Sequence, residues 1–217
     1  MSEATRVLAI RHGETAWNVD TRIQGQLDIG LNDVGRWQAV RLAQALADEP
    51  ITAIYASDLG RAFETAQHVS RVTGVPVTAT PGLRERHFGE FQGQTFAAIE
   101  ATLPEQAMRW RTRDPAFMPA GGESLVQLRE RVVGTAQLLA AQHPGELIMM
   151  VGHGGVLDIL YRAATRLELQ APRTWALGNA AINRLLWTPD GFTLVGWADT
   201  HHLEAQALEK PLDETST

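Results

Sequence analysis

Two histidines stand where apolar runs of the sequence stop, and the residues around them could do phosphate chemistry. Arg11 precedes His12 at the end of one run, and His153 lies between glycines at the end of another. A neutral imidazole can act as a nucleophile, and the planar fork of an arginine matches the oxygens of an oxyanion in pairs. Metal sites gather histidines with carboxylates and avoid neighbouring cations, so Arg11 beside His12 favours an anion over a metal. A lone histidine at such a turn is more often structural, so further evidence is needed.

Two more charged residues follow strand-like runs. Arg61 falls in the first turn of an expected helix, where the helix dipole disfavours a cation, so a bound anion would explain it. Glu85 comes directly after another short strand and could exchange a proton. From position alone, a solvated arginine and a surface carboxylate explain these two residues equally well.

Composition excludes several chemistries. Lys210 is the only lysine, so a lysine-dependent phosphate loop or Schiff base is not expected. The absence of cysteine excludes disulfides and thiolate nucleophiles. The net charge of -6 argues against a long nucleic-acid track. If side chains hold an anion here, arginine holds it.

Strand and helix signals alternate along the chain. The elements they predict must position the candidate site residues. The expected strands are 6–10, 51–56, 75–79 and 146–151, and the expected helices are 33–47, 57–74, 123–142 and 154–167. A hairpin is expected over 181–198, around Pro189-Asp190-Gly191. This order predicts an α/β fold, a three-layer α/β/α sandwich whose mostly parallel sheet is flanked by helices. Ligands of such sheets bind beyond the carboxyl ends of the strands, where both histidines fall.

The chain reads as one domain over residues 1–203. Glycine, proline, aromatics and short helical pieces at 96–102 and 105–111 indicate a small lid insertion over about 86–121, and 204–217 is expected to be a flexible tail. No apolar run approaches the roughly 20 residues of a membrane helix, and no secretory signal is visible. We therefore expect a cytoplasmic protein with no membrane and no nucleic-acid partner.

At this point the sequence resembles a known family. The matching residues are Arg11-His12-Gly13-Glu14-Thr15, Asn18, Gln24-Gly25, Arg61, Glu85, Gly121-Gly122-Glu123-Ser124 and His153. Over about residues 6–202 they resemble the histidine phosphatase superfamily, also called phosphoglycerate-mutase-like, and within it the small bacterial phosphatases.

The resemblance implies a role for each matching position. His12 would be the nucleophile that becomes a phosphohistidine, and Glu85 would protonate the leaving oxygen. Arg11, Arg61 and His153 would hold the phosphate, with His153 also catalytic. The residues expected to line the substrate pocket are Thr15, Asn18, Gln24, Gly25 and Gly154. No metal and no cofactor are expected.

Elementary electrostatics agrees with these roles. Two guanidinium charges near His12 should lower its pKa and keep the imidazole neutral. A phosphate dianion beside Glu85 favours the protonated carboxyl, which can then give its proton away. A covalent intermediate replaces one difficult step by two easier ones.

The sequence also departs from the family. Phe91-Gln92 stand where relatives commonly carry Trp-Glu, which we expect to affect loop packing or substrate fit. The lid has no lysine of the kind that mutases use for substrate binding, so water is favoured as the acceptor. The prediction is a phosphatase for small phosphorylated metabolites. A phosphoglycerate-type mutase and a phosphate-binding regulatory module with little turnover are the alternatives, and a homodimer stays open.

Three lid arginines remain ambiguous. Arg109, Arg111 and Arg113 surround Trp110, and they either contact a second anionic group of the substrate or form a solvated face. The directions in which these three side chains point cannot be predicted from the sequence.

Overall fold

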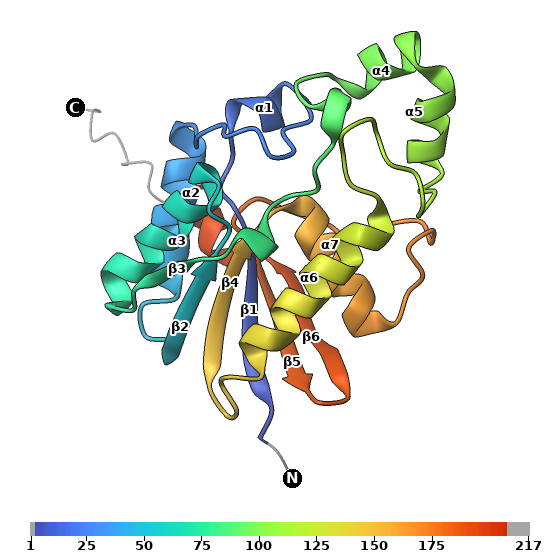
Figure 1. Ribbon diagram of the computed structural model, residues 1–217. Coiled ribbons are helices and arrows are strands. Elements are labelled where there is room, and N and C mark those ends of the chain that lie inside the picture. Colours follow the sequence, from blue (N-terminus) through green and yellow to red (C-terminus); the bar gives the residue numbers. More distant parts are fainter. Residues whose placement is uncertain (1–2, 208–217) are drawn as a thin grey trace, which may run out of the picture.

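A six-stranded sheet runs through the middle of the molecule (Figure 1). The computed structural model describes residues 3–207. The strand order is β3-β2-β4-β1-β5-β6. The strands are β1 (Thr5–Arg11), β2 (Ile51–Ala56), β3 (Val77–Ala79), β4 (Leu147–Gly152), β5 (Ile182–Thr188) and β6 (Gly191–Asp199). The first four strands pair in parallel, and the β5–β6 hairpin adds to β1 in antiparallel orientation.

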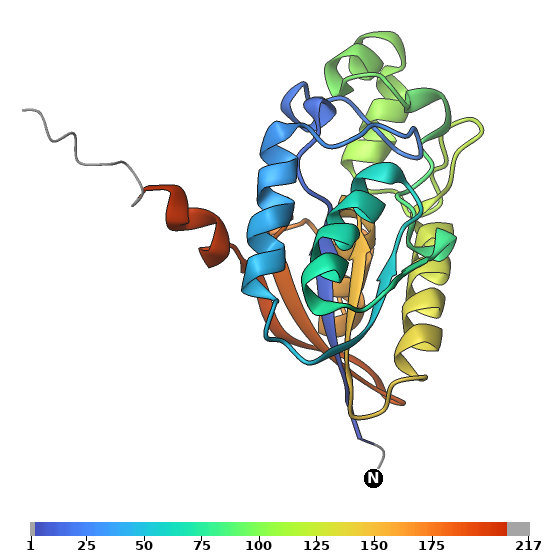
Figure 2. The same ribbon diagram turned by 90° about the vertical axis from the view of Figure 1, so that its left-hand side faces the viewer.

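Helices cover both faces of this sheet, as Figure 2 shows. One face carries α2 (Asp33–Ala45) and α3 (Gly60–Thr73), and the other carries α6 (Leu125–Ala140) and α7 (Gly154–Thr165). The predicted three-layer α/β/α sandwich with a mostly parallel sheet is confirmed.

The side chains of β1 explain why this strand lies between two helical layers. Val7 and Ala9 pack into the core beneath α6 and α7, whereas Leu8 and Ile10 pack into the core beneath α2 and α3. Successive residues of a strand point to opposite faces, so a continuous apolar run is buried on both sides.

Side-chain caps begin two of the flanking helices. The Asn32 carboxamide oxygen accepts from Gly35 N at 2.7 Å at the start of α2. Ser124 and Gln127 form a reciprocal capping box at the start of α6, so that helix begins at Leu125 rather than at the expected residue 123. Similarly, α3 begins at Gly60 rather than at Ser57, and Gly60 N donates to Asp28.

The lid lies beyond the carboxyl ends of the parallel strands (Figure 1). It contains η2 (Gly89–Phe91), α4 (Phe96–Thr102) and α5 (Pro104–Arg111), and η1 (Pro81–Leu83) precedes it. Its small apolar core is separate from the two cores of the sheet and consists of Phe91, Ile99, Ala107 and Phe117, with Trp110 packed against it.

Four short elements were not expected from the sequence, and two of them are η1 and η2. Helix α1 (Ala16–Val19) is a single turn, too short for a periodic signal. The 3-10 helix η3 (His201–Ala207) covers the first residues of the segment expected to be a tail and packs against α2. The rest of that segment, 208–217, lies outside the described residues. Over residues 3–207, no helix has the length and apolar character needed to cross a membrane.

Candidate active site

The two histidines lie side by side because their strands are neighbours in register. In the parallel pairing of β1 with β4, Arg11 stands opposite Gly152. The next residue of each strand is a histidine, and the ring centroids of His12 and His153 are 5.2 Å apart. The backbone N–H of His12 donates to the Gly152 carbonyl at 3.0 Å, which ties the two strand ends together.

A backbone carbonyl fixes the proton of His12. The ring is buried, 2% exposed, and its Nδ1 lies 2.7 Å from the Gly13 carbonyl oxygen. A carbonyl can only accept, so Nδ1 carries the hydrogen and Nε2 of the neutral ring keeps its lone pair. Burial lowers the pKa of His12 well below its usual value, and the charges of Arg11 and Arg61 lower it further. The predicted direction of the pKa shift is confirmed, with burial as its main cause.

Arg61 is buried in the first turn of α3 and is held by the loop that follows α1. Its Nη1 donates to the Leu27 carbonyl at 2.8 Å and its Nη2 to the Gly25 carbonyl at 2.7 Å. Gly25 has φ +52°, and a Cβ there would lie 2.3 Å from the side-chain oxygen of Gln92. Burial lowers the pKa of Arg61 to about 10.

Gln92, one of the two residues that depart from the family pattern, supports this loop. Its side-chain oxygen accepts from Gln26 N at 2.8 Å, between the two carbonyls that hold Arg61. Its neighbour Phe91 is fully buried in the lid core. The departure therefore acts on loop packing.

Three of the five buried side-chain nitrogens without partners among the described residues belong to Arg11, Arg61 and His153. They are Nε of Arg11, Nε of Arg61 and Nδ1 of His153. The two arginine nitrogens always carry hydrogen, and buried donors are almost always paired in folded proteins. Arg11 also donates from Nη1 to the Leu177 carbonyl, and this hydrogen bond orients its guanidinium group. The unmatched donors are suited to the oxygens of a bound anion.

His153 supports the site from a fully buried position. Its Nε2 lies 2.8 Å from the hydroxyl oxygen of Ser57, at the end of β2. Burial lowers its pKa well below the usual value, and the charge of Arg61 lowers it further. His153 is therefore also neutral at pH 7.

The Glu85 carboxylate is held at the N-terminus of α7. It accepts from Gly155 N at 3.0 Å and from Arg86 N at 2.7 Å. The first turn of α7 thus holds the Glu85 carboxyl group at the same end of the sheet as His12.

A cavity of about 160 Å³ is lined by most of these groups, but His153, which was predicted to hold the phosphate, lines neither this cavity nor its larger neighbour. Its lining residues are Arg11, His12, Asn18, Arg22, Ile23, Gln24, Gly25, Arg61, Glu85 and Phe88. Most of the predicted site residues therefore meet in one space. Gly154 lines a neighbouring cavity of about 410 Å³. Thr15 instead caps α1, where its hydroxyl accepts from Asn18 N at 3.2 Å, so its role is to shape the turn after His12.

Sequence reasoning missed three supporting residues. Ser57 stands at a strand end, as both histidines do, so the same rule could have found it. Asn179 donates to the His12 carbonyl at 2.9 Å from a distant loop, for which the sequence gives no signal. Arg22 lines the cavity and donates to the Gly93 carbonyl at 3.1 Å.

Residues 3–207 contain no cluster of three or more histidine, aspartate or glutamate side chains placed to hold a metal ion. The positive charge at the cavity comes from guanidinium groups.

Known proteins are similar to this chain in sequence and architecture. Residues 7–200 match the model of the family described as histidine phosphatase superfamily (branch 1). The chain is 40% identical over 202 residues to phosphoglycerate mutase-like protein 4 of Arabidopsis thaliana, covering 91% of this chain and 86% of the relative. It is 37% identical to a metal-independent phosphoserine phosphatase of the same plant, covering 94% and 85% of the two chains.

A solved structure of a relative has the same fold as this chain. The mycobacterial glucosyl-3-phosphoglycerate phosphatase, in a complex with VO3, superposes with a TM-score of 0.81 at 34% sequence identity. The match covers 90% of this chain and 99% of that one.

Proposed function

Because the chain belongs to the histidine phosphatase superfamily and is a phosphatase, we propose that it hydrolyses small phosphomonoester metabolites through a phosphohistidine on His12. The observation that carries the proposal is the Nδ1–H of His12 bonded to the Gly13 carbonyl, which leaves a neutral Nε2 beside two arginines. Two of the relatives are phosphatases of phosphoserine and of glucosyl-3-phosphoglycerate, which agrees with a small phosphorylated substrate.

In the first step the lone pair of His12 Nε2 forms a bond to phosphorus, and the bond from phosphorus to the ester oxygen breaks. The Glu85 carboxyl gives its proton to that oxygen, so a neutral alcohol leaves. Arg11 and Arg61 stabilise the charge on the three remaining phosphoryl oxygens.

In the second step water attacks the phosphohistidine. Glu85, now a carboxylate, takes a proton from the water as its oxygen bonds to phosphorus. The electron pair of the N–P bond returns to Nε2, and inorganic phosphate leaves. The neutral His12 and the protonated Glu85 are restored, so no metal is needed for the cycle.

Substitution of the nucleophile tests the proposal. We expect His12→Ala to abolish turnover of 4-nitrophenyl phosphate, because no other group replaces the attacking nitrogen. An acid-labile phosphoenzyme should be trapped in the unmodified protein and be absent from the variant. A chelator should leave the rate unchanged. The matched control is His201→Ala, which removes an exposed histidine paired with Asp199 and should keep full activity. Full activity in His12→Ala would refute the proposal.

Product analysis separates the alternatives. A phosphatase releases inorganic phosphate, a mutase moves phosphate within one molecule, and a regulatory module binds the phosphorylated compound without turnover. The chain's one lysine is Lys210, outside the lid, which disfavours the mutase. Location in the cytoplasm and assembly as a homodimer stay predictions, for which cell fractionation and light scattering of the purified protein are the tests.

A further inference from the structure

The carboxylate of the sequence motif Gly121-Gly122-Glu123-Ser124 has no role in the proposed chemistry. Ser124 begins α6, and Glu123 lies directly before it, where the chain returns from the lid. The Glu123 side chain is only 14% exposed and forms an ion pair with Arg131 of α6. Neither residue lines the phosphate cavity, so the pair stands outside the proposed reaction centre.

The ion pair between Glu123 and Arg131 is bidentate. Nε of Arg131 donates to one Glu123 oxygen at 2.8 Å, and Nη2 donates to the other at 2.7 Å. Two parallel hydrogen bonds between a planar guanidinium and a carboxylate fix the orientation of both side chains, which the point charge of a lysine cannot do. The other N–H groups of Arg131 therefore point in fixed directions.

These other N–H groups bind the chain segment that carries Glu85. Nη1 of Arg131 donates to the Gly82 carbonyl at 3.0 Å and to the Arg84 carbonyl at 2.8 Å. Nη2 donates to the Glu85 carbonyl at 3.4 Å, and the same carbonyl accepts from the Gln26 side chain at 3.1 Å. One guanidinium thus holds the backbone on both sides of the proposed proton donor.

The same carboxylate also joins the two ends of the lid. The backbone N–H of Glu123 donates to the His87 carbonyl at 2.8 Å, and the Glu123 carboxylate accepts from His87 N at 3.3 Å. A glycine of the motif permits this contact, because a Cβ at Gly122 would lie 2.7 Å from the His87 carbonyl oxygen. The outgoing and returning chains of the lid therefore lie against each other directly after Glu85.

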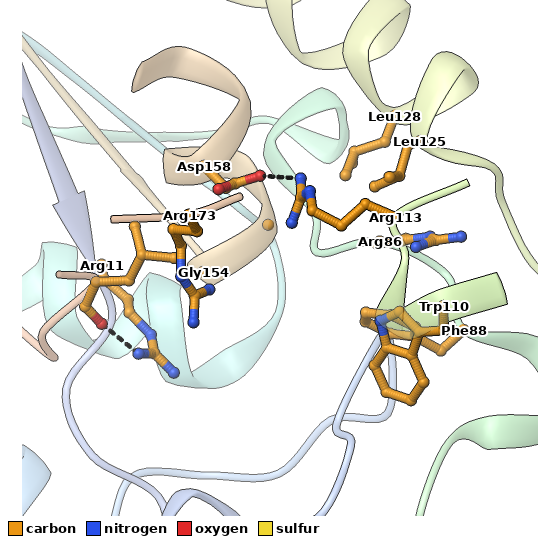
Figure 3. Close-up of a pocket in the computed structure, with 12 residues that line it drawn as sticks. Arg11, Arg86, Phe88, Trp110, Arg113, Leu125, Leu128, Gly154, Asp158 and Arg173 are labelled. Carbon is orange, nitrogen blue, oxygen red and sulfur yellow. Dashed lines mark hydrogen bonds and ion pairs between the residues drawn. The ribbon is translucent and has the colours of Figure 1, made fainter. Parts of the chain in front are cut away.

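Arg86 links this contact to the Glu85 carboxylate. Its Nε donates to the Glu123 carbonyl at 2.8 Å, and its Nη2 donates to the Phe117 carbonyl at 2.9 Å. Its backbone N–H donates to the Glu85 carboxylate at 2.7 Å. Figure 3 shows Arg86 beside Phe88, whose ring centroid lies 5.2 Å from the guanidinium carbon. The Glu85 carboxylate is thus bonded to a residue whose side chain the Glu123 backbone holds.

The three lid arginines whose role the sequence left open, Arg109, Arg111 and Arg113, pair elsewhere. Their carboxylate partners are Asp114, Glu100 and Asp158. Within the described part of the chain, none of the three donates to residues 82–86. Support of the Glu85 segment therefore comes from Arg131 and not from the arginines of the lid helix.

The position of a proton donor limits its rate. The donor must lie within hydrogen-bond reach of the oxygen it protonates, about 2.6–3.2 Å. A displacement on the order of 1 Å, caused by a change far from the reacting atoms, can cost about a hundredfold in rate. A group that fixes the backbone of Glu85 can therefore control proton donation without touching the substrate.

We propose that Arg131, oriented by Glu123, is a positioning residue that holds Glu85 within reach of the leaving oxygen. The inference rests on the proposed function, because it concerns the step in which Glu85 protonates that oxygen. It gives the carboxylate of the Gly121-Gly122-Glu123-Ser124 motif a role in the reaction that is exerted through a second residue.

The leaving group separates positioning from general structural support. Arg131→Gln removes the bidentate pair and the fixed donors to the Glu85 segment. We expect kcat for glycerol 3-phosphate, whose alkoxide needs a proton, to fall about 10- to 100-fold, and kcat for 4-nitrophenyl phosphate to fall much less. KM should change little for either ester, because Arg131 does not line the phosphate cavity. A loss of structure would lower both rates alike.

A double variant tests whether Arg131 acts through Glu85. In the Glu85→Gln background, Arg131→Gln should cause no further loss on glycerol 3-phosphate, because the proton that Arg131 positions is already absent. Glu123→Gln is a milder second variant, since it keeps the side-chain shape and one oxygen for Arg131. It should act in the same direction with a smaller effect, and it serves as the test if Arg131→Gln does not fold.

Arg129→Gln is the matched control, because Arg129 is exposed on the same helix and forms no ion pair within residues 3–207. Both of its rates should equal those of the unmodified enzyme. Unchanged rates or equal losses on the two esters in folded Arg131→Gln would overturn the positioning role, and so would a further loss in the Glu85→Gln background. Each of these results would leave His12→Ala inactive, whereas failure of the proposed function would leave His12→Ala active on 4-nitrophenyl phosphate.

Discussion

At the scale of the residue, single hydrogen bonds decide what each site group can do. The Gly13 carbonyl selects one form of His12, because only Nδ1 can donate to it. The N–H of Gly155 holds the Glu85 carboxylate where the leaving oxygen would depart. Neither bond involves the reacting atoms, yet each orients a side chain for its proposed step.

The role of Glu85 predicts a dependence on the leaving group. Glu85→Gln keeps a side-chain oxygen for Gly155 N but has no acidic proton. An alkoxide is a poor leaving group without protonation, whereas 4-nitrophenolate leaves readily. We expect kcat for glycerol 3-phosphate to fall by about 10²–10⁴ and kcat for 4-nitrophenyl phosphate to fall much less. Steady-state rates on the two esters measure this, and equal losses on both would rule out proton donation by Glu85.

The residue types of the site could be predicted from sequence, but their hydrogen bonds could not. His12, Arg11, Arg61 and Glu85 follow from residue chemistry at strand and helix ends. The form of His12 depends on how its ring turns toward Gly13, and the position of Asn179 depends on a loop far away in sequence. Such choices are made by three-dimensional contacts that local patterns do not contain.

At the scale of the element, close backbone contact between α2 and the turn after β1 positions His12. A Cβ at Gly13 would lie 2.4 Å from the Gly35 carbonyl oxygen, and a Cβ at Gly35 would lie 2.0 Å from the Glu14 carbonyl oxygen. The sequence alone does not pair these two glycines, because Gly13 lies in a turn and Gly35 lies within a helix.

Two glycine substitutions in helices should have opposite effects. Gly35→Ala forces α2 away from the turn that carries His12, so we expect the free energy of unfolding to fall by about 1–3 kcal/mol and phosphatase activity to fall with it. Gly134→Ala is the control on α6, where a Cβ meets nothing within 4 Å. It should raise the free energy of unfolding by about 0.5–1 kcal/mol with activity unchanged. Urea denaturation measures both, and equal stability of the two variants would contradict the contact.

At the scale of the whole molecule, the enclosed site links stability to pH. His12 and His153 are neutral when folded, because burial lowers their pKa well below the usual value. The unfolded chain restores an ordinary histidine pKa near 6.5. As the pH falls below that value, the unfolded state therefore binds protons that the folded state does not.

This linkage predicts that the free energy of unfolding decreases as the pH is lowered from 7 to 5. Each buried histidine contributes up to about 1.4 kcal/mol per pH unit. Carboxylates act at lower pH: the pKa of Asp199, lowered to about 2 chiefly by its bond to Arg184, affects stability below about pH 4. His12→Asn removes one titrating group, so its unfolding free energy should depend less steeply on pH. Urea denaturation at each pH tests this, and an identical slope would contradict the neutral buried state.

The fold as a whole could be read from the alternation of strands and helices, since runs such as Arg6–Ile10 carry a strong signal. The cavities could not, because they lie where the lid meets the sheet. Arg113 pairs with Asp158 of α7, and Arg173 and Arg11 line one cavity, only once those segments are docked.

The separate apolar core of the lid, formed by Phe91, Ile99, Ala107 and Phe117, has a consequence for how such enzymes diversify. Since these side chains pack among themselves, mutations within α4 and α5 can remodel the lid without disturbing the cores that hold β1 and β4. Substrate preference can therefore change while the phosphoryl chemistry is retained. A graft of residues 95–118 from a relative offers a route to a new specificity with the same catalytic residues.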